Sequence, residues 1–235
     1  MRFAAPLLEA RLVRRRQRFL ADVELAGGGT ATAHCPNTGS MLGCQAPGAR
    51  VFLSESTSPG RRYPLTWELV EAPGGTLVGI NTARTNRLVA EALDDGVVTE
   101  LRGCSGRRAE VPVPGGDGRL DFLLERPGTS PYYLEVKNVT AAVEEGLARF
   151  PDAVSERATR HVRTLAALRS RGYGAGLLFC VQRADVQAVA PADDIDPAYG
   201  AALREAAASG VDVLAYGADV TPAGIVVRRP LPVRL

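Results

Sequence analysis

Two acidic residues and a lysine stand where neighbouring strands can bring them together. Glu135 and Lys137 lie two residues apart in the apolar segment 132–139, and Asp121 lies in the preceding segment 118–125. Both segments have the composition of β-strands, and a Pro- and Gly-rich stretch separates them. Because residues two apart on a strand share a face, Glu135 and Lys137 point the same way. Asp121 reaches the same place if the two strands pair as a hairpin.

Lys137 is the only lysine among the 28 Lys and Arg residues of the chain. This composition indicates a drift that replaced lysine by arginine wherever either residue serves. Lysine is a compact charge with an adjustable pKa, whereas arginine is a broad planar fork whose pKa is too high to adjust. On a largely apolar strand, a carboxylate and an ammonium are also costly to desolvate unless they are paired or bound to a metal. The surviving lysine therefore indicates chemistry at Lys137.

Asp121 followed by Glu135-x-Lys137 resembles the core of PD-(D/E)xK nucleases. The resemblance implies that Asp121 and Glu135 bind Mg²⁺ or Mn²⁺, and that Lys137 orients or deprotonates the attacking water. Carboxylate oxygens suit Mg²⁺, and the metal lowers the pKa of a bound water and offsets charge on the phosphoryl group. The E-x-K pattern is common in itself, so a surface hairpin with a Glu–Lys pair stays the alternative.

A first helix is expected over residues 83–95, where apolar residues form one stripe and Gly96 ends the pattern. Glu91 lies beside that stripe. In PD-(D/E)xK folds a glutamate on the first helix often completes the metal site, so Glu91 is a third candidate ligand and catalytic residue. An exposed surface glutamate is the alternative.

A second helix is expected over residues 152–171, with Asp152 as its N-cap. The residues expected to face the core are Val154, Ala158, Val162, Leu165 and Leu168. Arg157, Arg160 and His161 fall on one polar face, which could hold the scissile phosphate of DNA. An ordinary solvated, arginine-rich helix explains the same pattern.

The N-terminal third reads as all-β. Short β-like segments follow one another at residues 19–25, 30–34, 49–54, 63–71 and 76–81. About five strands in about 80 residues predict a small barrel of the OB type, and such barrels often bind single-stranded nucleic acid. A simple sandwich or an SH3-like barrel fits nearly as well.

Two features of this third are candidate DNA contacts. The first is a basic run that could follow a phosphate backbone if it is extended, and it includes Arg14, Arg15, Arg16 and Arg18. The second is a turn in which hydroxyl and amide side chains lie near exposed backbone N–H groups, an arrangement that can bind an anion. The turn residues concerned are Asn37, Thr38 and Ser40. A solvated surface strand is the alternative for the basic run.

The chain has 235 residues, 46% of them hydrophobic and 23% charged, which is typical of a soluble globular protein. The net charge of +2 is too small to indicate nucleic acid by itself. No apolar stretch approaches the ~18 residues of a membrane span, and no secretory signal is apparent. The four cysteines form no C-x-x-C pattern, so reduced thiols and a cytoplasmic location are expected.

After residue 132, strand and helix patterns alternate. The apolar run 174–181 predicts a buried central strand, Asp196-Pro197 begins a further helix, and 211–216 is again a strand. We therefore expect a two-domain α+β protein. Residues 1–82 would form an OB-like β-barrel, and residues 83–235 an α/β domain of the PD-(D/E)xK, restriction-endonuclease-like type.

Seven stretches, in this order and spacing, make the chain similar to the sugar fermentation stimulation protein A family. They are residues 18–23, 34–41, 66–70, 81–82, 121–125, 135–140 and 150–154. The resemblance implies the two domains above, DNA binding with little sequence preference, and a regulatory part in sugar utilisation. The chain departs from the family pattern at Gly118, where a serine is usual, and at Arg160, where a lysine is usual.

These observations together predict a DNA-binding protein, largely indifferent to sequence, with a nuclease-like, Mg²⁺-dependent phosphodiesterase site. The alternative is a catalytically silent DNA-binding regulator on a nuclease scaffold, because a fold does not establish an activity. Single- or double-stranded DNA is the expected partner, and no membrane contact is expected. The oligomeric state stays open, with a homodimer as one arrangement.

Overall fold

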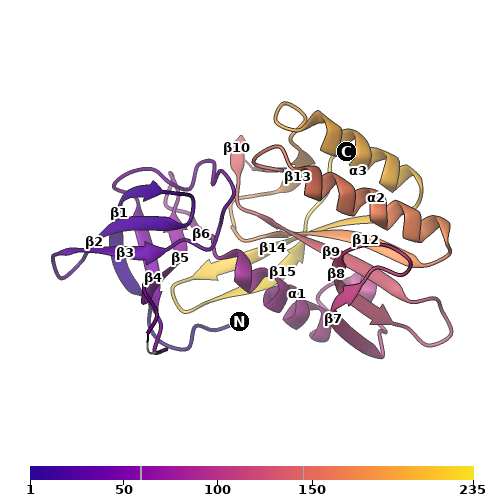
Figure 1. Cartoon of the computed structure of the whole chain (residues 1–235), viewed down its shortest axis with the longest axis horizontal. Helices are drawn as coiled ribbons and strands as arrows, with labels where there is room; N and C mark the ends of the chain where they lie inside the picture. Colours follow the sequence, from indigo (N-terminus) through magenta and orange to yellow (C-terminus); the bar gives the residue numbers. More distant parts are fainter. Residues whose placement is uncertain (59, 145) are drawn as a thin grey trace.

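The computed structural model describes residues 1–58, 60–144 and 146–235. The first part of the chain forms one sheet (Figure 1). Its strands are β1 (Leu8–Arg16), β2 (Leu20–Leu25), β3 (Thr30–His34), β4 (Arg50–Glu55), β5 (Leu65–Glu71) and β6 (Leu77–Gly79). They lie in the order β3-β2-β1-β4-β5-β6, and a parallel bridge from His34 on β3 to Thr66 on β5 closes β1 to β5 into a barrel. The prediction of an OB-type barrel is confirmed over the sandwich and SH3-like alternatives.

The barrel forms because each strand buries one face around Trp67, which is fully buried together with Leu53 and Leu12. At the β1–β2 turn, Gln17 and Arg18 have φ values of 51° and 65°. Two central residues with positive φ match the twist of a tight hairpin. The basic run is therefore extended along β1 and ends at an exposed hairpin tip.

The second part of the chain is an α/β domain, as predicted. Its helices are α1 (Thr85–Asp94), α2 (Glu156–Ser170) and α3 (Pro197–Ala208), with short 3₁₀ turns η1 (Thr82–Arg84) and η2 (Thr99–Leu101). Its main strands are β7 (Gly106–Pro112), β8 (Arg119–Glu125), β9 (Tyr132–Val139), β12 (Gly174–Val181), β14 (Asp212–Thr221) and β15 (Gly224–Pro230). A small second sheet consists of β10 (Ala142–Glu144), β11 (Leu147–Phe150) and β13 (Ala188–Pro191).

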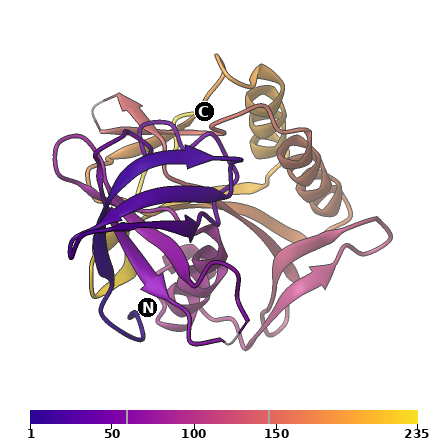
Figure 2. The same cartoon turned by 60° about the vertical axis from the view of Figure 1, so that its left-hand side comes forward.

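The main sheet has the order β15-β14-β12-β9-β8-β7, with β9, β12 and β14 parallel at its centre. The helices α2 and α3 cover one face and α1 covers the other (Figure 1). Figure 2 shows the barrel in front of one end of this sheet. Both faces of the central strands are covered, which explains why β12 is apolar throughout. The alternation along β9 then decides which side chains face α2.

Two local expectations are wrong. Helix α2 begins at Glu156, and its N-cap is Ser155, whose side chain accepts a hydrogen bond from the backbone N–H of Ala158. Asp152 therefore precedes the helix, and Val154, expected in the core, is 73% exposed. Capping by Ser155 rather than Asp152 shifts the start of the helix by one turn.

The first two residues of the chain pair with the second domain. The ammonium of Met1 donates a hydrogen bond of 2.7 Å to the carbonyl of Ile225, and Arg2 forms a bridge with Gly224. Strand β15, which the sequence patterns did not predict, supplies both partners. Within the described parts of the chain, no helix combines the length and the apolar character needed to cross a bilayer.

Candidate active site

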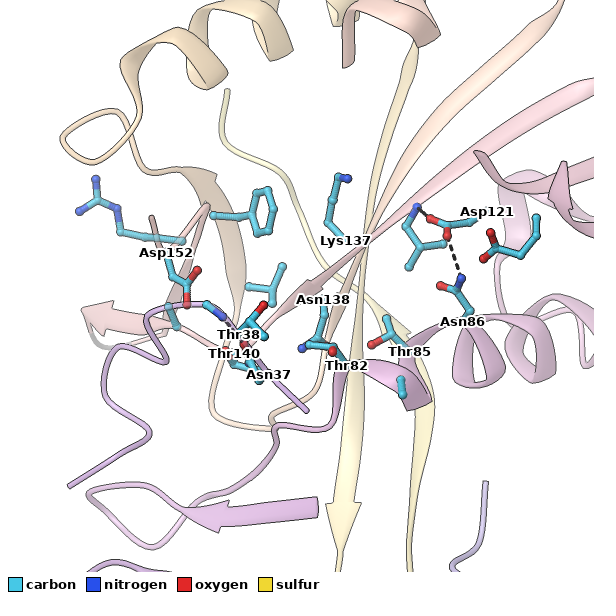
Figure 3. A pocket seen from close by; sticks show the side chains of 18 residues that line it. Asn37, Thr38, Thr82, Thr85, Asn86, Asp121, Lys137, Asn138, Thr140 and Asp152 are labelled. Atoms are coloured by element: carbon cyan, nitrogen blue, oxygen red, sulfur yellow. Dashed lines mark hydrogen bonds between the residues drawn. The ribbon is translucent and has the colours of Figure 1, made fainter. Parts of the chain in front are cut away.

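The three residues singled out by their chemistry lie on the paired strands β8 and β9. The two strands pair antiparallel, with Phe122 opposite Leu134, so Asp121 and Glu135 come next along the ladder. The Oδ2 atom of Asp121 accepts a hydrogen bond of 2.7 Å from the backbone N–H of Val136 (Figure 3). The hairpin expected from the sequence is confirmed, and it places the two carboxylates on facing strands.

Glu135 is a buried acceptor shared by the side chains of Lys137 and His161. The Nζ atom of Lys137 donates a hydrogen bond of 2.7 Å to Oε1 of Glu135, whose side chain is 4% exposed. Nδ1 of His161 contacts the same oxygen. Because Nδ1 must carry a hydrogen to donate to Glu135, it cannot also accept one from Lys137, which lies 3.4 Å away. Lys137 is therefore positioned through the carboxylate alone.

The surroundings push the pKa values of the two carboxyl groups apart. Burial, and then repulsion from Glu135, raise the pKa of Asp121 against the hydrogen bonds from Val136 and Asn86. Burial would also raise the pKa of Glu135, but hydrogen bonds and charge from His161 and Lys137 lower it. Glu135 is therefore held ionised. Asp121 is expected to bind a proton or a cation more readily than an ordinary aspartate does.

The polar face predicted for α2 borders the same site. A hollow of about 690 Å³, which we call the arginine hollow, is lined by Asp121, Glu135, Arg119, Arg157, Arg160, His161 and Thr164, among others. Arg157 and Arg160 are exposed. The helical spacing is confirmed in its geometry, and the contact of this face with phosphate stays a prediction.

Glu91 does not join the site. Its carboxylate lies 2.5 Å from the Met1 ammonium and 3.0 Å from Nε of Arg87. The residue of α1 that reaches the site is Asn86, whose Nδ2 donates a 2.7 Å hydrogen bond to Asp121 (Figure 3). Five residues along an α-helix correspond to a rotation of about 140°, so Asn86 and Glu91 face different ways. The expectation for Glu91 as a metal ligand is wrong.

Glu110 is an acidic residue at the site that the sequence patterns did not indicate. It lies on β7 between Ala109, which pairs with Phe122, and Val111, which pairs with Leu120. It therefore stands across from Asp121, and it borders the arginine hollow with an exposed side chain. Its φ of 51° lies in the left-handed region, where non-glycine residues are rare and strained. Such strain collects at functional sites.

In the turn expected to bind an anion, two backbone N–H groups are hydrogen-bonded within the protein. The backbone N–H of Gly39 donates to Oδ1 of Asn37 at 2.9 Å, and the N–H of Met41 donates to Oδ2 of Asp152 at 2.9 Å. Asp152 thus links the second domain to a barrel loop 111 residues away in sequence. These two N–H groups are therefore not free for an outside anion, whereas contact of Asn37, Thr38 and Ser40 with DNA stays a prediction. Asn37 and Thr38 line a second hollow, described below. The Oγ atom of Ser40 is buried.

The basic run of β1 is divided between two faces. Arg14 and Arg16 both pair with Asp22 at 3.0 Å. Arg15 points the other way and donates to the carbonyls of Arg18, Asn37 and Gly39 at 2.8–2.9 Å. Arg14, with a side chain 70% exposed, and Arg18 at the hairpin tip are the best placed to meet phosphate, and that contact stays a prediction.

These contacts predict opposite outcomes for two arginine substitutions. Arg15→Ala removes charge-assisted bonds to three carbonyls, so we expect a loss of about 2 kcal/mol and a Tm lower by roughly 4–8 °C. Arg14→Ala leaves Asp22 paired with Arg16, so Tm should stay within about 1 °C. Scanning calorimetry of both variants measures this. Equal Tm values for the two variants would contradict the structural role of Arg15.

The oxygen donors at the site suit a hard divalent cation. Asp121 and Glu135 offer carboxylate oxygens on facing strands, and repulsion from Glu135 adds to the effect of burial in raising the pKa of Asp121. Among the residues that the structure describes, no group of three or more His, Cys, Asp or Glu side chains is arranged to hold a metal ion. Mg²⁺ is commonly bound through one or two carboxylates together with water and substrate phosphate, so two carboxylates are sufficient.

Two family models match the chain in succession. Residues 13–80 match the SfsA N-terminal OB domain, and residues 83–224 match the sugar fermentation stimulation protein RE domain. The sugar fermentation stimulation protein homolog of Halorhodospira halophila is 57% identical, over 99% of this chain and 98% of its own. The homolog of Pseudomonas aeruginosa is 55% identical over the whole of both chains. The solved structure of Pyrococcus furiosus SfsA in complex with Ca²⁺ has a TM-score of 0.89 at 26% identity, covering 100% of this chain and 98% of that one.

Proposed function

The chain belongs to the sugar fermentation stimulation protein family, and on that premise we propose that it is a DNA-binding protein with a divalent-metal-dependent phosphodiesterase site. Asp121 and Glu135 would hold Mg²⁺ or Mn²⁺, and DNA would be bound with little regard to sequence. A regulatory part in sugar utilisation is part of the same proposal.

One observation carries the proposal. Asp121 accepts from the backbone N–H of Val136, between Glu135 and the sole lysine of the chain. Both carboxylates line a hollow that exposed Arg157 and Arg160 also line. An ion pair of Glu135 and Lys137 that only supports the fold does not require a second carboxylate nearby. Asp121 is such a carboxylate, and its burial and its repulsion from Glu135 are unfavourable. Arginine side chains recognise phosphate oxygens through paired N–H donors. The Ca²⁺ in the related Pyrococcus furiosus structure also supports an oxygen-donor cation site.

The side chains of this protein have separate roles in the proposal. Arg157 and Arg160 orient the phosphate, and Nζ of Lys137 holds or transfers a proton next to the attacking water. His161 and Glu135 fix the position of Lys137, because Oε1 of Glu135 accepts from both. A divalent cation would stabilise the negative charge that develops on the phosphoryl oxygens.

The second candidate is a protein that binds DNA without cleaving it. It is favoured because, within the described ranges, no group of three or more His, Cys, Asp or Glu side chains is arranged to hold a metal ion. It is also favoured by the commitment of Oε1 of Glu135 to two internal hydrogen bonds. The arginine hollow would then serve binding alone.

The purified protein, incubated with end-labelled single- and double-stranded DNA, distinguishes the two candidates. We expect cleavage in Mg²⁺ or Mn²⁺ and none in EDTA, and a mock purification controls for contaminating nucleases. Gel-shift titrations on the same DNAs in Ca²⁺ measure binding separately. Binding without cleavage in any metal supports the second candidate, and the absence of binding refutes both.

A further inference from the structure

A second hollow lies on the other side of Asp121, between the two domains. It has a volume of about 630 Å³, within the range of small-molecule sites, and shares Asp121 and Glu110 with the arginine hollow. We call it the interdomain hollow. Its polar lining comes from the barrel loop and from the start of α1 and the end of β9, including Asn37, Thr38, Thr82, Asn86 and Asn138 (Figure 3).

The two hollows differ in charge. Apart from Asp121 and Glu110, each charged side chain in the interdomain hollow already has a partner: Arg149 pairs with Asp194, and Asp152 accepts from the backbone N–H of Met41. Lys137, at the border, is bound to Glu135. The remaining polar groups are neutral amides and hydroxyls, so a phosphate has no reason to prefer this side of the site.

Asn37 marks the interdomain hollow as a binding site for a polar, uncharged group. The residue is only 6% exposed, and its Oδ1 accepts from the N–H of Gly39. That bond fixes the orientation of the amide, because only the oxygen can accept a hydrogen. Its Nδ2 makes no hydrogen bond to the described residues and lies at the wall of the hollow. Nδ2 of Asn138, which lines the same hollow, is buried and has no partner among the described residues. Buried donors without a partner are uncommon in folded proteins and require an explanation.

Apolar side chains provide flat surfaces in the same hollow. Phe150, Val136 and Ala83 line it, and the ring of Phe150 is held by an edge contact with Tyr199, with centroids 5.2 Å apart. Nucleobases combine apolar faces with donors and acceptors along one edge. Amides and hydroxyls beside apolar walls therefore match a base better than they match a phosphate.

We infer that the interdomain hollow binds one unpaired nucleobase, next to a phosphate that occupies the arginine hollow. The inference rests on the proposed function and narrows its substrate to single-stranded or locally unpaired DNA. A base within an intact duplex is stacked and paired, so it cannot enter a hollow between two domains without being extruded. An unpaired strand has no such cost.

The test compares Asn37→Ser with the wild type. A serine hydroxyl can still accept from Gly39, but its one O–H donor lies closer to the backbone than the Nδ2 that it replaces. Affinities are measured for a short strand of deoxythymidines and for an abasic strand of equal length and charge. We expect Asn37→Ser to weaken binding of the first about 5-fold, the scale of one hydrogen bond between neutral groups, and to leave the abasic strand unaffected. The salt dependence should not change.

Thr38→Val supplies a second variant that will fold, because this exposed side chain makes no hydrogen bond to the described residues. It should act selectively on the base-containing strand in the same way. Thr129→Val, in the turn at the far end of β8 and β9, is the matched control and should bind both strands as the wild type does. Equal effects of both hollow variants on both strands, or no effect on either, would overturn the base pocket. A wild type that binds neither strand would instead refute the proposed function.

Discussion

Lys137→Arg is expected to lower the rate of metal-dependent DNA cleavage by on the order of 10²-fold or more, the usual scale for a general acid–base group. The substitution keeps the charge but replaces a compact ammonium by a fork that cannot release a proton near neutral pH. Lys137 is only 13% exposed and lies 2.7 Å from Glu135, so the larger guanidinium would also displace the group from its position. DNA affinity should stay within about 2-fold because the net charge is unchanged.

The controls for Lys137→Arg separate catalysis from structure. Arg87→Lys makes the reverse exchange on the exposed face of α1, where a lysine can retain the ion pair with Glu91. It should cleave DNA at the wild-type rate. If Lys137 only pairs with Glu135, arginine can pair equally well, and Lys137→Arg should keep both activity and Tm. A folded Lys137→Arg protein that cleaves as fast as the wild type would rule out the catalytic role.

The central hairpin could be predicted because its information is local. Alternation along residues 132–139 determines which side chains share a face, and the turn before it sets the antiparallel pairing with β8. The position of Glu135 next to Lys137 follows from that alternation alone. The polar face of α2 was predictable for the same reason, since helical periodicity places Arg157, Arg160 and His161 together.

The partners of individual side chains depend on contacts between distant segments. Glu91 is bound to Met1, 90 residues before it in the chain, and no periodicity reveals that contact. The local sequence around Asp152 is typical of a helix N-cap. Its carboxylate instead accepts a hydrogen bond from the backbone N–H of Met41 in the barrel loop. The same docking of the two domains creates the interdomain hollow. A pattern read along one segment cannot include a surface that exists only after both domains have folded.

Asp121→Asn is expected to raise the Tm of the metal-free protein and to weaken its binding of metal. In the absence of metal, the raised pKa of Asp121 means that the folded protein favours its protonated form. Its contribution to stability is therefore greatest below the ordinary pKa of an aspartate and declines as the pH rises through the folded value. An asparagine is neutral throughout, so metal-free Asp121→Asn should have a higher Tm at pH 7, by roughly 2–4 °C. The gain should disappear at acid pH.

In the presence of a divalent metal, the wild type should have a higher Tm than Asp121→Asn. A cation that binds only the folded state raises the Tm of the wild type, whereas Asp121→Asn loses a ligand and should bind Mg²⁺ or Mn²⁺ more weakly by about 100-fold. Asp219→Asn is the matched control, because this exposed carboxylate pairs with Arg228 at 3.0 Å rather than with a second acid. It should bind metal as the wild type does and show no gain in Tm. Calorimetric titration of the three proteins decides the question, since equal metal affinity in Asp121→Asn and the wild type would exclude Asp121 as a ligand.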